Sequence, residues 1–128
     1  MGQQQLLLIV LGVIVVGIAI IVGINLFNAN AVSANRDAVI SDLNNLAAMA
    51  QQYYKKPSSM GGGANTFTSW TIPPQIDTTA NGTYALTTSG AQSIVITGTG
   101  TETGNDGSAK VSATATVTPT AVTVSVSN

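Results

Sequence analysis

The order of apolar and polar residues divides the start of the chain into two stretches with different patterns. In residues 6–24 every side chain is Leu, Ile, Val, Ala or Gly. In residues 25–56 polar residues return, and apolar ones recur every three, four or seven positions, the spacing of one face of an α-helix. No proline precedes Pro57, and a proline disfavours helical geometry in the residue before it. We therefore predict one long helix over residues 3–56.

The apolar face of the second stretch predicts what this part of the helix packs against. We expect this face to form the core beneath a following domain, with Asn35 and Asp42 lying largely away from it. Phe27 and Val32 precede that domain, and we expect them to pack against other copies of the chain. The residues of the helix–head packing face are Val39, Leu43, Leu46, Ala50 and Tyr53.

The rest of the chain carries the alternating pattern of β-strands. Residues 57–65 are rich in Gly and Ser and predict a flexible linker, and residues 66–128 form a Thr-rich head. The alternation places Val, Ile and Ala on one sheet face, which needs a cover, and Thr and Ser on the other. The predicted fold is α+β, with four to five antiparallel strands packed on the second half of a long N-terminal helix. Strands are predicted over 67–72, 84–87, 93–97, 109–117 and 122–126, with a two-residue hairpin turn at Asn81–Gly82.

The apolar stretch is long enough to cross a lipid bilayer. The 19 residues from Leu6 to Ile24 reach about 28 Å as a helix, close to the hydrocarbon thickness of about 30 Å. A cleaved secretory signal has a shorter apolar region, a basic start and a small-residue cleavage site, whereas Met1–Gln5 carries no basic residue. We expect residues 6–24 to remain in the mature protein.

The composition removes most of the chemistry that a protein site can perform. The chain has no Cys and no His, so thiolate chemistry and the commonest general base are absent. Charged residues make up 7 %, with a formal net charge of −1, which gives little reason to bind nucleic acid. The few carboxylates are scattered along the chain. We expect no enzyme activity, no cofactor and no metal site.

Two segments of the head have the residue types of a modification site or a cation site. Asn81-Gly82-Thr83 matches the N-glycosylation acceptor pattern, and a hairpin tip explains the same residues without a sugar. Glu102, Asn105 and Asp106 carry oxygen ligands, but two carboxylates fall short of a calcium-loop spacing. Asn-Asp-Gly is a common turn sequence, and we interpret this segment as a turn.

Taken together, these features resemble the type IV pilins and related pilin-like proteins. The resemblance lies in a short leader ending in Gly2, an uninterrupted apolar helix, an amphipathic continuation and a small β-rich head. It implies that residues 1–2 are a leader, that a prepilin peptidase cuts between Gly2 and Gln3, and that the new amino terminus is methylated. The chain departs from the usual bacterial pattern, because Leu7 stands at the fifth mature position in place of Glu.

The function expected on this basis is that of a structural subunit of an extracellular pilus-like filament. The subunit first resides in the cytoplasmic membrane and then joins identical subunits, an assembly ATPase and a membrane platform protein being implied by the resemblance. Its transfer buries the apolar first half of the helix against the same surface of other copies. The expected filament-core residues are Leu6, Leu7, Ile9, Val13, Val16, Ile20, Ile24 and Phe27.

Two alternatives share the same sequence features. A monomeric membrane-anchored binding or adhesion module needs the membrane span and the head, but neither cleavage at Gly2 nor an apolar face that continues through Phe27 and Val32. A pseudopilin, which forms a short piston in a secretion system, has the same architecture as a pilin. Filament length on cells separates these two pilin-like functions.

Overall fold

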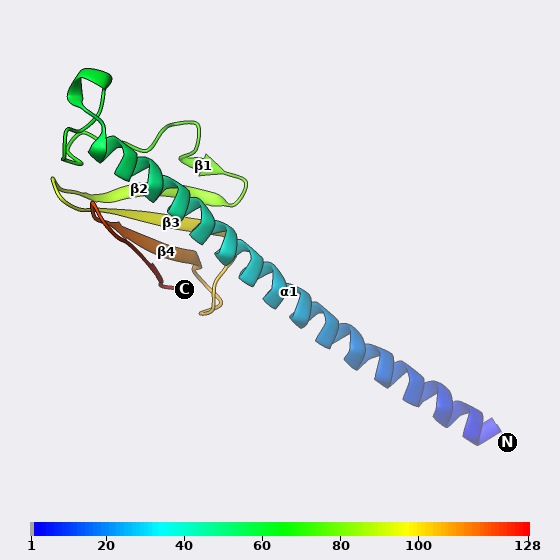
Figure 1. Cartoon of the computed structure of the whole chain (residues 1–128). Coiled ribbons are helices and arrows are strands. Elements are labelled where there is room, and N and C mark those ends of the chain that lie inside the picture. Colours follow the sequence, from blue (N-terminus) through cyan, green and yellow to red (C-terminus); the bar gives the residue numbers. More distant parts are fainter. Residues whose placement is uncertain (1) are drawn as a thin grey trace. The chain divides into compact units, whose positions relative to one another are not determined.

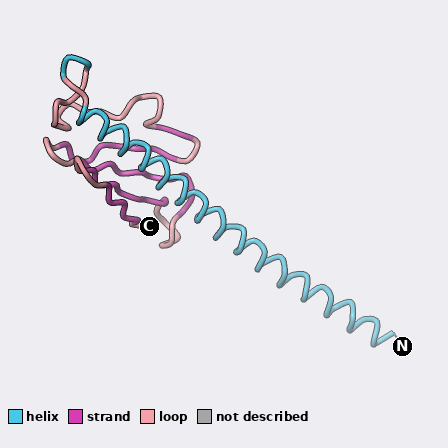
Figure 2. Tube along the Cα trace, in the orientation of Figure 1, coloured by secondary structure: helices cyan, strands magenta, loops and turns pink. Residues whose placement is uncertain are grey.

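The computed structural model describes residues 2–128 and has one long helix followed by a five-stranded sheet (Figures 1 and 2). All neighbouring strands are antiparallel, in the order β1-β2-β3-β4-β5. The predicted α+β fold with a C-terminal antiparallel sheet is thus confirmed. The elements are α1 (Gly2–Lys55), the 3₁₀ turn η1 (Ser58–Met60), β1 (Thr78–Thr79), β2 (Gly82–Ser89), β3 (Ile94–Thr103), β4 (Lys110–Val117) and β5 (Val122–Val126).

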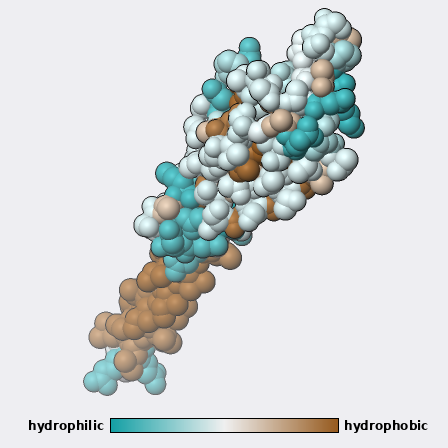
Figure 3. Space-filling view, turned by 90° about the vertical axis from the view of Figure 1, so that its left-hand side faces the viewer, coloured by the Kyte–Doolittle hydropathy of each residue, from teal (hydrophilic) through white to brown (hydrophobic). Residues whose placement is uncertain are grey.

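The chain divides into two compact units, one ending at Ala31 and one comprising Val32–Asn128. In the first unit every described residue up to Asn30 is exposed. Its large apolar side chains are more than half exposed, from 53 % at Ile14 to 74 % at Phe27. In the space-filling view this apolar part of α1 is brown, between hydrophilic residues at either end (Figure 3). By length and composition alone, α1 has a segment able to cross a membrane.

In the second unit, the end of α1 covers one face of the sheet (Figure 1). Val39, Leu43, Leu46 and Ala50, four of the five expected packing residues, are buried in the core. The fifth, Tyr53, packs at the core edge and donates its hydroxyl proton to the carbonyl oxygen of Thr68 at 3.0 Å. Sheet and loop residues complete this core: Phe67, Trp70, Tyr84, Ile94, Ile96, Ala113, Ala115 and Val117.

Two glycines of β3 let the helix approach the sheet closely. A Cβ on Gly98 would contact Val39, and one on Gly100 would overlap the side-chain oxygen of Asn35. Asn35 and Val39 are four residues apart on the helix, a rise of about 6 Å, and the two glycines are two residues apart on the strand, a rise of about 6.6 Å. Asn35 and Val39 are therefore seated over the bare backbone of Gly100 and Gly98.

The long third strand departs from the sequence prediction because of these glycines. The predicted strand ended at Thr97, since a Thr- and Gly-rich sequence is typical of a loop. In the structure β3 continues to Thr103, with Gly98 paired with Tyr84 and Ala113, and Gly100 with Gly82. The glycines are tolerated within the strand because the helix lies directly against them.

The strand predicted over residues 67–72 is wrong. The segment is a loop in which Phe67 is fully buried, with its ring centroid 4.8 Å from that of Tyr54. Its backbone N–H bonds to the carbonyl of Ala91, while Trp70 N–H bonds back to the carbonyl of Phe67. Ser69 between them has φ +71°, a left-handed conformation that ends any strand. The aromatic residues therefore act as single anchors in the core.

The predicted hairpin exists with its turn shifted by one residue. Thr79 pairs with Gly82, so Ala80 and Asn81 form the two-residue loop and Gly82 begins β2. Gly82 packs directly on the backbone of Thr99, where a Cβ would overlap the carbonyl oxygen. The close packing of β2 on β3 therefore requires a glycine at position 82, whatever backbone conformation the turn itself needs.

Residues 57–65, expected as a flexible connection, fold back onto the end of α1. Backbone N–H groups of Gly63, Ala64 and Asn65 bond to helix-end carbonyls at 2.8, 3.0 and 2.7 Å. The acceptors are the carbonyls of Tyr53, Lys56 and Tyr54 respectively. The segment thus satisfies carbonyls that an α-helix leaves without partners.

The helix supplies the predicted cover for only part of the apolar face of the sheet. Val111, Ala113, Ala115 and Val117 of β4 are fully buried, but on β5 Val122 and Val126 are 36 % and 43 % exposed. Five strands are about 19 Å wide at about 4.8 Å per strand, whereas a helix with its side chains is about 10 Å across. One helix therefore covers the central strands and leaves edge strand β5 partly uncovered.

Candidate assembly surface

The apolar surface of α1 from Leu6 to Phe27 is the leading candidate for a functional surface. The expected filament-core residues all lie on it, each between 56 % and 74 % exposed. Gly2 and Gln3, the predicted cleavage junction, lie exposed in the first turn of the helix. No charged side chain precedes Arg36, so the surface is neutral as well as apolar. Such a surface is suited to lipid or to another apolar helix.

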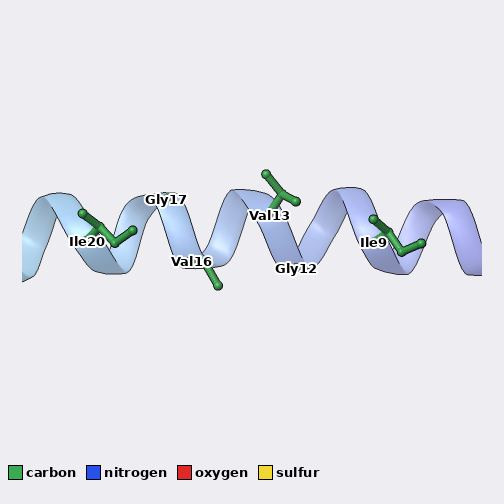
Figure 4. A pocket seen from close by; sticks show the side chains of 6 residues that line it. All are labelled: Ile9, Gly12, Val13, Val16, Gly17 and Ile20. Atoms are coloured by element: carbon green, nitrogen blue, oxygen red, sulfur yellow. The ribbon is translucent and has the colours of Figure 1, made fainter.

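A shallow groove runs along this surface where glycines leave the backbone bare. Figure 4 shows the side chains that line it, with Gly12 and Gly17 between them. The lining side chains belong to Ile9, Val13, Val16 and Ile20. Four of the expected filament-core residues therefore surround the two glycines.

The glycines of the two units differ in whether neighbouring atoms of the chain leave room for a side chain. In the second unit, an added Cβ would collide with neighbouring atoms at Gly63, Gly82, Gly98 and Gly100, so the fold itself requires these glycines. At Gly12, Gly17 and Gly23 an added Cβ would meet nothing within 4 Å. A glycine inside a helix costs about 1 kcal/mol relative to alanine, and no contact within residues 2–128 offsets that cost. Nothing within residues 2–128 therefore accounts for these three glycines, and close approach of a neighbouring helix or local loosening of α1 are the two readings that would.

Asn35 anchors the start of the second unit. It is 9 % exposed. Its amide nitrogen donates to the carbonyl of Asn81 at 2.8 Å and to the hydroxyl of Thr101 at 3.3 Å. Its amide oxygen accepts from the backbone N–H groups of Thr101 and Glu102 at 3.1 and 3.3 Å. One side chain thus joins α1 to both the β1–β2 loop and β3.

Asp42 forms a second anchor two turns further along α1. One carboxylate oxygen accepts from the Tyr84 hydroxyl at 2.6 Å, and from the Thr79 hydroxyl and the Asn81 side-chain amide, each at 3.2 Å. Burial raises the pKa of Tyr84, and its hydrogen bond to the Asp42 carboxylate raises that pKa further. The tyrosine therefore stays protonated as a donor far into alkaline pH.

The predicted placement of Asn35 and Asp42 away from the packing face is wrong. Both polar side chains contact the sheet or its loops. The spacing of Asn35 and Val39 is the signal that the prediction missed, since residues four apart lie on one helix face. A polar residue in line with a buried stripe is a candidate for a hydrogen-bonded anchor.

The remaining local candidates have structural roles in the head. The side chain of Asn81, the glycosylation candidate, already donates to Asp42. Asp106 accepts from the N–H groups of Ser108 and Ala109 at 3.0 and 2.9 Å, and these bonds hold the pKa of its carboxyl below its usual range. Gly107 follows at φ +75°. The segment is a closed turn, as interpreted from its sequence.

Comparison with protein-family models, with curated proteins and with solved structures found no match for this chain. The functional argument therefore rests on the residues themselves. Its two parts are an uncharged apolar helix surface with bare glycines, and a folded head anchored on the amphipathic end of the same helix.

Proposed function

We propose that this chain is the structural subunit of an extracellular, type IV pilus-like filament that polymerises through the first half of α1. The observation that carries the proposal is the contrast between the glycines. Gly12, Gly17 and Gly23 lower helix stability, and within residues 2–128 no contact requires them. Small residues let helices approach closely in apolar surroundings. A second copy of the same helix supplies such a neighbour.

The subunit acts by exchanging one apolar environment for another. Before assembly, residues 6–24 lie in the membrane, where helical hydrogen bonding satisfies the backbone polar groups. During assembly the same surface transfers to the helices of other copies, with Val13, Val16 and Ile20 seated beside the glycines of a neighbour. The missing acid at Leu7 leaves apolar packing as the main interaction within this core. A repeated head-to-tail contact of this kind gives an open helical polymer.

A membrane-anchored monomeric binding module receives less support. A cleft on the head, lined by Asp42, Asn45, Leu46, Ile76 and Thr79, has a volume of ≈ 80 Å³. Small-molecule sites usually have volumes of about 300–1,000 Å³. The monomeric module also gives no reason for the glycines of the apolar surface.

Gly17→Leu tests the proposal because it separates membrane insertion from assembly. Leucine keeps the segment apolar and improves its helix propensity, so the variant should insert into the membrane as the parent chain does. Its side chain fills the groove, however, and blocks close approach of a second helix. The expected result is normal membrane content and loss of filaments in sheared surface fractions, scored by electron microscopy and by mass spectrometry of the subunit.

Gly17→Ala is the matched control, since a single methyl group should leave most assembly intact. Val16→Asp should abolish filaments as well, though it also disturbs insertion. Filaments of normal number in Gly17→Leu cells would contradict close packing at this groove.

Absence of the chain from every surface filament would refute the function as a whole. Mass spectrometry of the amino terminus tests cleavage after Gly2 separately, and filament length distinguishes a pilus from a secretion piston.

A further inference from the structure

The charged side chains of the second unit are separated between its two ends. At one end, named here the basic end, Lys55 is the last residue of α1, Lys56 follows it, and both are exposed. At the other, named the acidic end, Asp37 and Glu102 are exposed beside the loop that carries Asp106. Lys55 lies 18 positions after Asp37 on one continuous helix, a rise of about 27 Å.

The separation gives the head opposite charges at its ends. The chain has four basic and five acidic residues. The two lysines give the basic end a formal charge of +2. At the acidic end Asp37, Glu102 and Asp106, with Arg36 and Lys110 near them, give 2 − 3 = −1. The ends lie more than two Debye lengths apart at physiological ionic strength, where that length is about 8 Å. Within one copy they hardly interact.

The two cationic side chains near the acidic end both donate hydrogen bonds to uncharged oxygen atoms. Arg36 donates to the side-chain oxygen of Asn105 at 3.0 Å, and Lys110 donates to the carbonyl oxygen of Thr101 at 2.7 Å. Neither bond is to a carboxylate. The negative charge of Asp37 and Glu102 is therefore left for a partner outside the chain.

The lysines of the basic end are not needed to satisfy the end of the helix. Lysine near a helix C-terminus often interacts with its last carbonyls. Here the carbonyls of Tyr53, Tyr54 and Lys56 already accept from backbone N–H groups of the following loop. Both lysines are exposed, so their charge is available to a partner.

We infer that Lys55 and Lys56 of one copy contact Asp37 and Glu102 of the next copy, in a head-to-tail contact that sets the axial order of the heads. The inference rests on the proposed filament. Copies in a polar polymer point the same way, so the basic end of one head faces the acidic end of another. The complementary charges belong to a single chain, which makes a second copy the partner that fits both ends.

A charge-swap experiment on the full-length chain tests this contact. One variant combines Lys55→Glu with Lys56→Glu, a second combines Asp37→Lys with Glu102→Lys, and a third carries all four changes. The third has the same formal charge as the parent chain, so net charge is controlled. Filaments are assembled from purified detergent-solubilised chains by detergent removal, and the chain concentration that supports assembly is measured by pelleting and electron microscopy. Trp70 fluorescence in the same samples reports whether each head is folded.

Each double variant should raise the concentration needed for assembly about tenfold, which corresponds to about 1.4 kcal/mol, and the fourfold variant should restore the parent value. The parent filament should also weaken at about 1 M salt, where the Debye length is about 3 Å. Only another copy can supply the rescue, because the two ends are too far apart within one head.

Assembly of either double variant at the parent concentration would overturn the contact and leave the proposed filament standing. If the double variants fail to assemble and the fourfold variant does not restore assembly, the proposed contact is overturned too. The lysines would then stabilise their own head or bind an anionic partner. If the parent chain forms no filaments after detergent removal and is also absent from the surface filaments of cells, the proposed function fails and the contact fails with it.

Discussion

Replacing Asn35 should cost the head a large part of its stability, because one side chain serves three backbone groups and a hydroxyl. Asn35→Ala removes the donor to the Asn81 carbonyl and the acceptor for the N–H groups of Thr101 and Glu102. A buried polar group left without a partner costs about 1–3 kcal/mol. These groups lie near the rim of the core, where water reaches some of them, so we expect a total loss of about 2–4 kcal/mol.

The chain offers a convenient assay and a matched control. Its single tryptophan, Trp70, is 6 % exposed in the core of the head, so its fluorescence reports unfolding of the second unit in the full-length chain in detergent. Urea titrations then give the free energy of unfolding. Asn44→Ala changes the same residue type at an exposed site of the same helix and should shift stability by less than about 0.5 kcal/mol.

Asn35→Asp separates the two halves of the anchor. The variant keeps the acceptor for Thr101 and Glu102 but turns the donor into a second oxygen that faces the Asn81 carbonyl. Ionisation is then unfavourable in the folded state, which raises the folded pKa of the new carboxyl above its unfolded value of about 3.9. Its penalty should therefore shrink as the pH falls toward 4, because a protonated carboxyl donates again. The reasoning is refuted if Asn35→Ala unfolds with the same midpoint as Asn44→Ala, or if Asn35→Asp shows no such relief.

Two further perturbations test how the helix is seated on the sheet, with the same urea assay. Gly100→Ala should destabilise the head by about 1–3 kcal/mol through overpacking, because its Cβ would overlap the Asn35 side-chain oxygen; unchanged or higher stability would show that the helix can move away at little cost. Raising the pH above about 10 should weaken the parent head, because the folded pKa of Tyr84 is raised and the unfolded tyrosine loses its proton first. Tyr84→Phe should lower the free energy of unfolding at pH 7 and should make it depend less on pH above about 10. If stability falls as steeply with pH in this variant as in the parent chain, groups other than Tyr84 cause the loss.

The parts of the fold that the sequence predicts are those in which each segment determines its own structure. The apolar run and the amphipathic stripe each have a helical period, and β4 and β5 alternate strictly around a proline-containing turn. Their boundaries in the structure agree closely with the pattern. Helix, sheet type and packing face follow, since each depends on periodicity within one segment.

The parts that the sequence did not predict depend on contacts between distant segments. β3 continues through Gly98 and Gly100 because a helix lies over them. The sequence of residues 98–103 by itself does not reveal this packing. Phe67 reads as a strand residue but is held in a loop by Tyr54 and Ala91. Asn35 reads as a solvent-facing polar residue until its partners, at least 46 positions away in the sequence, are placed beside it. In each case tertiary packing overrode local preference.

The energetics of the proposed assembly give the head a larger role than its size suggests. Moving Val16 or Ile20 from lipid to a helix bundle exchanges one apolar surrounding for another, so little of the usual 1.5–3 kcal/mol for burying such a side chain from water is gained. Close packing at Gly12 and Gly17 supplies part of the difference through dispersion contacts. A uniform apolar helix surface, however, permits several axial offsets between neighbours. Oppositely charged head ends would favour the offset that brings unlike charges together. Offsets that bring like charges together have a higher free energy. In the proposed polymer, charge separation across the head and glycines along the helix thus meet complementary requirements.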